Sequence, residues 1–150
     1  MNFWPKSTDF ARPKKGRKRP NLGKKRASPE HAIQVQVVNA FDDYWSNVPH
    51  GTKKPELLAI PNGGKRHIRT AIKLKREGVR SGAPDLLIIL PGGRAAFLEL
   101  KSEKGRLSKA QDDFRQRLQV LGAWWDVAHS VDEAFGILAA WGCLPSEAKR

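Results

Sequence analysis

The sequence lacks several features that would point directly to a compartment or a chemistry. Cysteine occurs once in 150 residues, at Cys143, so the chain cannot form an internal disulfide. No apolar stretch approaches the ~20 residues that cross a bilayer, and no apolar segment follows the first residues as in a signal peptide. These absences predict a protein of a reducing compartment, and we expect it in the cytoplasm with no membrane partner.

Common catalytic motifs are also missing. The sequence has neither a Gly-x-Ser-x-Gly nucleophile elbow nor a Walker-type phosphate loop. The four histidines show no metal-ligand spacing, and one cysteine does not suggest a zinc site. We therefore expect no small-molecule cofactor.

Acidic residues are scarce beside basic ones. The chain has 15 Asp and Glu against 28 Lys and Arg, a net charge of +13, which favours a polyanionic partner such as DNA. Residues 1–29 hold ten of the basic residues and one acidic residue. This segment, rich in Pro and Gly, is predicted to be a disordered basic arm that grips phosphates, or else a solvated tail. Its densest basic block is Lys14, Lys15, Arg17, Lys18 and Arg19.

Residues 30–150 form the predicted folded domain, whose hydrophobic periodicity alternates between helix and strand. Helices are predicted at 29–46, 67–77, 108–121 and 131–141, and strands at 57–60, 86–90, 97–101 and 123–128. The order α-β-α-β-β-α-β-α predicts an α/β fold, a mixed β-sheet flanked by α-helices.

An acid and an acid–lysine pair lie at the open end of the hairpin over 85–101. Glu99 and Lys101 alternate with apolar residues, so they share one face of their strand. If the loop is Pro91 to Gly93, Asp85 lies opposite Glu99. If the loop is only Gly92 and Gly93, Asp85 falls opposite Leu100, on the wrong face.

Buried carboxylates at this position need a compensating charge, and a bound divalent cation would supply it. Mg²⁺ or Mn²⁺ prefers carboxylate oxygens and would lower the pKa of a bound water, while Lys101 would orient or polarise that water. The alternative is a surface Asp85 and a solvent-facing pair of Glu99 and Lys101.

Two further side chains each have two interpretations. Glu30 could add a third carboxylate to the site, or it could simply stabilise the N-terminus of the first helix. Gln111 could complete a capping box with Ser108, or it could hold a water or a phosphate near Lys101. One amide would hardly serve both purposes at once.

Basic and polar side chains in the middle of the chain are candidates for nucleic-acid binding. Asn62, Lys65 and Arg66 belong to a Gly-rich loop, which could equally be a plain turn. Lys73, Lys75 and Arg80 lie on or after the second predicted helix, which could also be an ordinary solvated face.

The ordered set of motifs resembles the VRR-NUC (virus-type replication-repair nuclease) module of the PD-(D/E)xK nuclease superfamily, over roughly residues 28–142. The matching residues are Glu30, Gln34, Asn62-Gly63-Gly64, Gly82-Ala83-Pro84-Asp85-Leu86, Pro91-Gly92-Gly93-Arg94, Phe97-Leu98-Glu99-Leu100-Lys101, Gly105-Arg106-Leu107-Ser108 and Gln111.

This resemblance implies a restriction-endonuclease-like core and cleavage of DNA that depends on Mg²⁺ or Mn²⁺. It implies metal ligation by Asp85, Glu99 and Glu30, and catalytic-site roles for Lys101 and Gln111. It further implies a homodimer of phage or bacterial origin that cuts branched DNA such as four-way junctions. The rival functions are a nucleic-acid-binding protein with an inactive nuclease fold and, thirdly, a ribonuclease or a sequence-specific restriction enzyme.

Overall fold

The computed structural model describes residues 28–61 and 67–144, and eight elements follow one another in the expected order. They are α1 (Pro29–Ser46), β1 (Glu56–Ala59), α2 (Ile68–Arg76), β2 (Leu86–Ile89), β3 (Ala95–Leu100), α3 (Lys109–Val120), β4 (Trp124–Ala128) and α4 (Val131–Ala140). Each boundary lies within two residues of its predicted place. The basic block at 14–19 and the loop residues Asn62, Lys65 and Arg66 lie outside the described residues.

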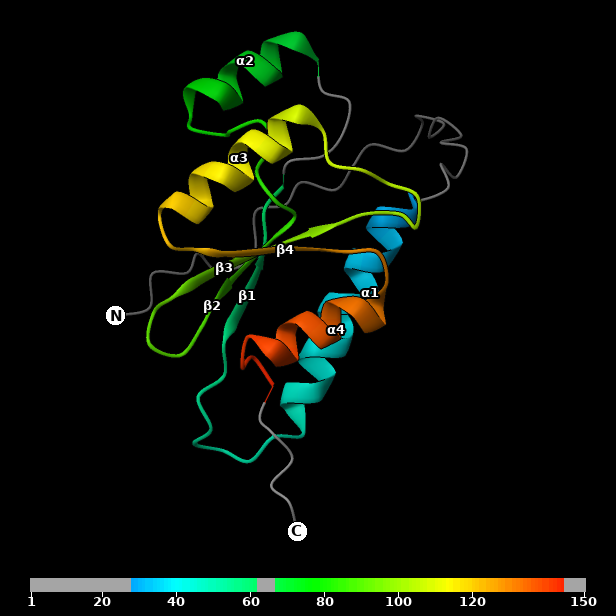
Figure 1. Ribbon diagram of the computed structural model, residues 1–150, viewed down its shortest axis with the longest axis vertical. Coiled ribbons are helices and arrows are strands. Elements are labelled where there is room, and N and C mark those ends of the chain that lie inside the picture. The colour runs from blue at the N-terminus through cyan, green and yellow to red at the C-terminus, as the bar shows by residue number, and fades with distance from the viewer. Residues whose placement is uncertain (1–27, 62–66, 145–150) are drawn as a thin grey trace, which may run out of the picture.

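The four strands form one mixed sheet in the order β1-β2-β3-β4. β1, β2 and β3 are antiparallel, whereas β4 runs parallel to β3, so the predicted mixed sheet is confirmed. Helices lie on both faces of this sheet, with α3 on one side and with α1 and α4 together on the other (Figure 1). This arrangement is consistent with a restriction-endonuclease-like α/β fold.

The loop between β2 and β3 decides how the acidic residues face each other. The Leu90 N–H donates to the Arg94 carbonyl at 2.9 Å, so the loop comprises the three residues 91–93. Its two glycines have φ of 95° and 85°, a backbone conformation that favours glycine. Leu86 pairs with Leu98 in this register, and the next position therefore sets Asp85 opposite Glu99. The three-residue alternative is the correct one.

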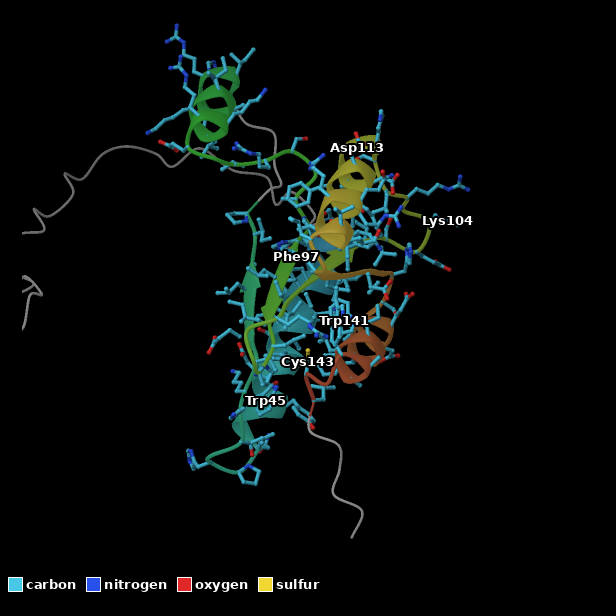
Figure 2. All side chains as sticks on the ribbon, turned by 60° about the vertical axis from the view of Figure 1, so that its left-hand side comes forward. Trp45, Phe97, Lys104, Asp113, Trp141 and Cys143 are labelled. Atoms are coloured by element: carbon cyan, nitrogen blue, oxygen red, sulfur yellow. The ribbon has the colours of Figure 1, made fainter. Side chains whose placement is uncertain are left out.

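The hydrophobic core lies between the sheet and the pair of helices α1 and α4. Alternate residues of β2 and β3 face it, so the period of two that is expected of strands is visible in their burial. Figure 2 shows Trp45, Trp141 and Cys143 on this side of the molecule. The core comprises Val37, Phe41, Trp45, Leu86, Ile88, Leu90, Ala96, Leu98, Leu100, Ala128, Ala134, Leu138 and Cys143. Among the described residues, no helix has the length and apolar character to cross a membrane.

Candidate active site

The opposite face of the sheet carries the polar residues singled out by the sequence. Asp85 immediately precedes β2, Glu99 lies across from it in β3, and Lys101 directly follows β3. Glu99 is only 2% exposed and Lys101 only 8% exposed. The alternative of a solvent-facing Glu–Lys pair is therefore wrong, because water cannot solvate these charges as it would on a surface.

Each of these charges has a defined partner. The Lys101 Nζ lies 2.8 Å from the Glu99 Oε1, a buried ion pair. The Asp85 Oδ2 accepts the Leu100 N–H at 2.9 Å, so the carboxylate lies against the backbone between the other two residues. The Asp85 carbonyl accepts the Ile60 N–H at 2.7 Å, which attaches this segment to the end of β1. Asp85 thus points toward Glu99 and Lys101, not away from them.

Gln111 completes the predicted capping box and also contacts the buried acid of the site. Its Oε1 accepts the Ser108 N–H at 2.9 Å, and the Ser108 Oγ accepts the Gln111 N–H at 3.3 Å, which completes the capping box of α3. Its Nε2 donates to the Glu99 Oε1. One amide makes both contacts because its carbonyl oxygen and its NH₂ group lie at opposite corners. The group that it holds is the Glu99 carboxylate. A water or phosphate held by Gln111 near Lys101 stays a prediction.

The electrostatics of the site favour added positive charge. Burial, with a smaller contribution from the charge of Asp85, raises the pKa of Glu99 to about 7 despite the opposing hydrogen bond from Lys101. Partial burial also raises the pKa of Asp85, against the Leu100 N–H and the charge of Lys101, which lower it. These two neighbouring carboxylates hold protons more tightly than usual, and a cation between them would reverse that preference.

Glu30 occupies the first turn of α1, after the Ser28 N-cap and Pro29. Its negative charge raises the pKa of both Asp85 and Glu99, so it faces the same site. No three or more His, Cys, Asp or Glu side chains converge closely enough to hold a metal ion within the described ranges. A third carboxylate ligand accordingly remains a prediction.

The donor set nevertheless fits Mg²⁺ or Mn²⁺. Asp85 and Glu99 supply hard carboxylate oxygens from adjacent strands, and such cations commonly bind one or two carboxylates and keep several waters. Neither a cysteine nor a histidine would be needed as a ligand. The site is therefore chemically suited to the cation that the sequence predicts.

One contact at this site was missed by the sequence analysis. Gly82 has a φ of +78°, and a Cβ atom placed on it would lie 2.1 Å from the Ala110 carbonyl oxygen. Only glycine allows the loop before Asp85 to pack so closely on the first turn of α3. The positions of Asp85 and Gln111 are thereby linked through two backbones. The signal was the glycine three residues before Asp85, but nothing in the sequence identified its neighbour.

The predicted DNA-contact residues on and after α2 all lie at the surface. Lys73 and Lys75 are exposed on α2, and Arg80 is exposed just beyond it. α2 lies on the outer side of α3, away from the sheet (Figure 1), and has no buried residue. The structure does not bring these side chains to the carboxylates, although α2 lies on the same side of the sheet as α3 (Figure 1).

Comparison with known proteins agrees with this geometry. The family model for the VRR-NUC domain matches residues 29–132, and the chain therefore belongs to the VRR-NUC family, a family of nucleases. A solved structure described as a VRR_NUC domain has 24% identity and a TM-score of 0.52, covering 77% of this chain and 99% of that one. Another, a VRR_NUC domain protein, has 23% identity and a TM-score of 0.59, covering 78% and 90%. No curated protein sequence matched.

Proposed function

We propose that this protein is a Mg²⁺- or Mn²⁺-dependent DNA endonuclease that prefers branched DNA such as four-way junctions. The observation that carries the proposal is the arrangement of half-buried Asp85 beside the buried pair of Glu99 and Lys101 at one end of the sheet. Two acids with raised pKa values and an adjacent buried lysine are costly to fold, and such arrangements concentrate at functional sites.

The residues divide the work of phosphodiester hydrolysis. Asp85 and Glu99 would hold the divalent cation, with Glu30 as a further ligand. The cation, when bound, neutralises phosphate charge and lowers the pKa of water. Lys101 orients the attacking water and offsets the negative charge that develops on the phosphate. Gln111 keeps the Glu99 carboxylate in position from the N-terminus of α3.

The choice of DNA rests on charge. The net charge of +13 favours a polyanion such as DNA. Selection of a branched shape by a homodimer, with two sites on one junction, needs no base readout. The basic arm and the exposed lysines of α2 would supply backbone contacts that carry no sequence information.

The test is a cleavage panel of junction, flap, duplex and single-stranded DNA, with and without Mg²⁺ or Mn²⁺, beside a measured solution mass. Lys101→Ala and Asp85→Asn are expected to lower the cleavage rate by at least about 100-fold while DNA binding persists. Lys54→Ala and Asp126→Asn are matched controls, because both side chains are exposed outside the site.

Each result decides between the rival functions. Salt-sensitive binding by the wild type with no metal-dependent cut would favour the inactive nuclease fold. Full activity of Lys101→Ala would remove its catalytic assignment. Cleavage of a single-stranded RNA, tested beside the DNA panel, with no cleavage of any DNA would favour a ribonuclease.

A further inference from the structure

The loop that leaves the active site after Lys101 is held in place by a histidine from the neighbouring strand. The Ser102 carbonyl accepts the Gly105 N–H at 2.8 Å, which closes a turn over residues 102–105. The same oxygen lies 2.9 Å from the Nδ1 of His129, the residue after β4. Because a carbonyl only accepts, the Nδ1 must carry the proton. The turn is therefore fixed to the end of β4.

The parallel pairing of β3 and β4 explains why His129 reaches this loop. Leu100 pairs with Ala128, and the Lys101 N–H donates to the Ala128 carbonyl at 2.9 Å. The next position along both strands sets Lys101 beside His129. The backbone of His129 is also held, since its N–H donates to the Glu133 Oε2 at 2.7 Å.

The turn folds back against the base of Lys101. A Cβ atom placed on Gly105 would lie 3.1 Å from the Lys101 Cβ and 3.0 Å from the Ser102 Oγ. A side chain at this position would be crowded, so Gly105 lies close against the base of Lys101.

Two basic side chains of this loop have no acidic partner. Lys104 and Arg106 are exposed, and neither forms an ion pair with another described residue. Lys54, Lys73 and Lys109, in contrast, each pair with a carboxylate. Glu103 is exposed in the same turn and offsets one of the two charges. Figure 2 shows Lys104 at the outer margin of the molecule, on the loop between β3 and α3.

We propose that Lys104 and Arg106 bind the phosphates beside the scissile phosphate, and that His129 is a positioning residue which holds this turn. The inference rests on the proposed nuclease function, because a phosphodiester at Asp85 and Glu99 brings its neighbouring phosphates to this loop. Each DNA strand carries a phosphate every ~3.4 Å of axial rise, so the two side chains can reach different phosphates.

The test measures binding of a fluorescein-labelled four-way junction by anisotropy, in EDTA, between about 50 and 200 mM salt. Lys104→Ala/Arg106→Ala is expected to reduce the log–log salt slope by about 2 and to weaken binding at least about tenfold at low salt. KM for cleavage should rise while kcat stays near the wild-type value. Lys53→Ala is the control, an exposed lysine in the loop between α1 and β1.

His129 is tested by a pair of substitutions. His129→Ala should reduce the salt slope and raise KM, whereas His129→Asn should restore both, because an Asn amide can donate to the Ser102 carbonyl from the place of Nδ1. A purely structural role would lower the thermal midpoint without changing the salt slope.

An unchanged salt slope and KM in Lys104→Ala/Arg106→Ala would overturn the proposal, even if His129→Ala proves unable to fold. If the wild type cuts DNA, that result in the double variant would still leave the nuclease function intact. A wild type that binds DNA but never cuts, with a salt slope that falls by about 2 in Lys104→Ala/Arg106→Ala, would refute the nuclease function and leave the phosphate contacts of this loop standing.

Discussion

Replacing Gln111 by alanine tests whether the active site contributes to the stability of the domain. The substitution removes an acceptor from the capping box of α3 and a donor from the buried Glu99 carboxylate. Loss of a helix cap costs about 1 kcal/mol. Loss of a hydrogen bond to a charged group costs about 1.5–3 kcal/mol, and water cannot replace it at a carboxylate that is 2% exposed. We expect a total loss of about 2.5–4 kcal/mol.

The chain provides a matched control in α4. Glu133 occupies the same third helical position, its N–H donates to the Ser130 Oγ at 3.1 Å, and its side chain accepts the His129 N–H. No contact to a buried carboxylate is added there. Glu133→Ala should therefore cost only the cap, about 1 kcal/mol. Ser108→Ala, which removes only the cap of α3, should cost a similar amount.

The assay is urea unfolding followed by tryptophan fluorescence in EDTA, with all variants compared at neutral pH and Gln111→Glu also measured in acid. A third variant separates the two roles of the amide, because Gln111→Glu keeps an oxygen for the cap and places a carboxylate oxygen against Glu99. We expect it to lose at least as much stability as Gln111→Ala at neutral pH and to recover part of it in acid. Equal losses for Gln111→Ala and Glu133→Ala would refute the reasoning.

Two more predictions concern the same end of the sheet. The pKa of Glu99 is raised to about 7 from 4.5, so its contribution to stability is fully present below about pH 4.5 and is lost as the pH rises through about 7. Urea unfolding in EDTA should show that the free energy of unfolding falls by roughly 3 kcal/mol across this range. Most of that loss should disappear in Glu99→Gln. Identical pH profiles for the two proteins would contradict the assignment. Gly82→Ala should cost roughly 2–5 kcal/mol, because a positive φ and a collision with the backbone of α3 add together. Gly78→Ala, with a φ of +101° and open space around it, should cost only about 1–2 kcal/mol, and a similar loss at both glycines would show that the contact with α3 can relax.

The sequence predicted the elements of the fold well because their signals are local. Hydrophobic periodicity, the capping box at Ser108 and the glycine turn of the hairpin each act within a few residues, and each was found where expected. The opposition of Asp85 and Glu99 could also be derived, because a hairpin loop of known length fixes the register of both strands. Only the loop length was ambiguous.

The sequence could not predict contacts that depend on long-range packing. Gly82 packs on Ala110 of α3, which is 28 positions away in the sequence. His129 contacts Ser102, which is 27 positions away. Both contacts follow from the parallel docking of β4 and the placement of α3, for which no single residue gives a signal. The double role of Gln111 was missed for the same reason, since the capping box was visible in the sequence and the neighbouring carboxylate was not.

These contacts explain how a small sheet can keep the Glu99 carboxylate buried beside Asp85 before any cation arrives. The Glu99 carboxylate forms an ion pair with Lys101, two residues further along the chain. It also accepts a hydrogen bond from the neutral amide of Gln111 on α3. The strand register fixes the position of Lys101, and the capping box of α3 fixes the position of Gln111. Neither side chain therefore depends on a flexible loop for its place. The pKa of Glu99 nevertheless stays near 7, which means that these partners stabilise the carboxylate only in part. A divalent cation would supply the positive charge that is still missing. The Glu99 carboxylate therefore affects both the stability of the fold and the proposed catalysis.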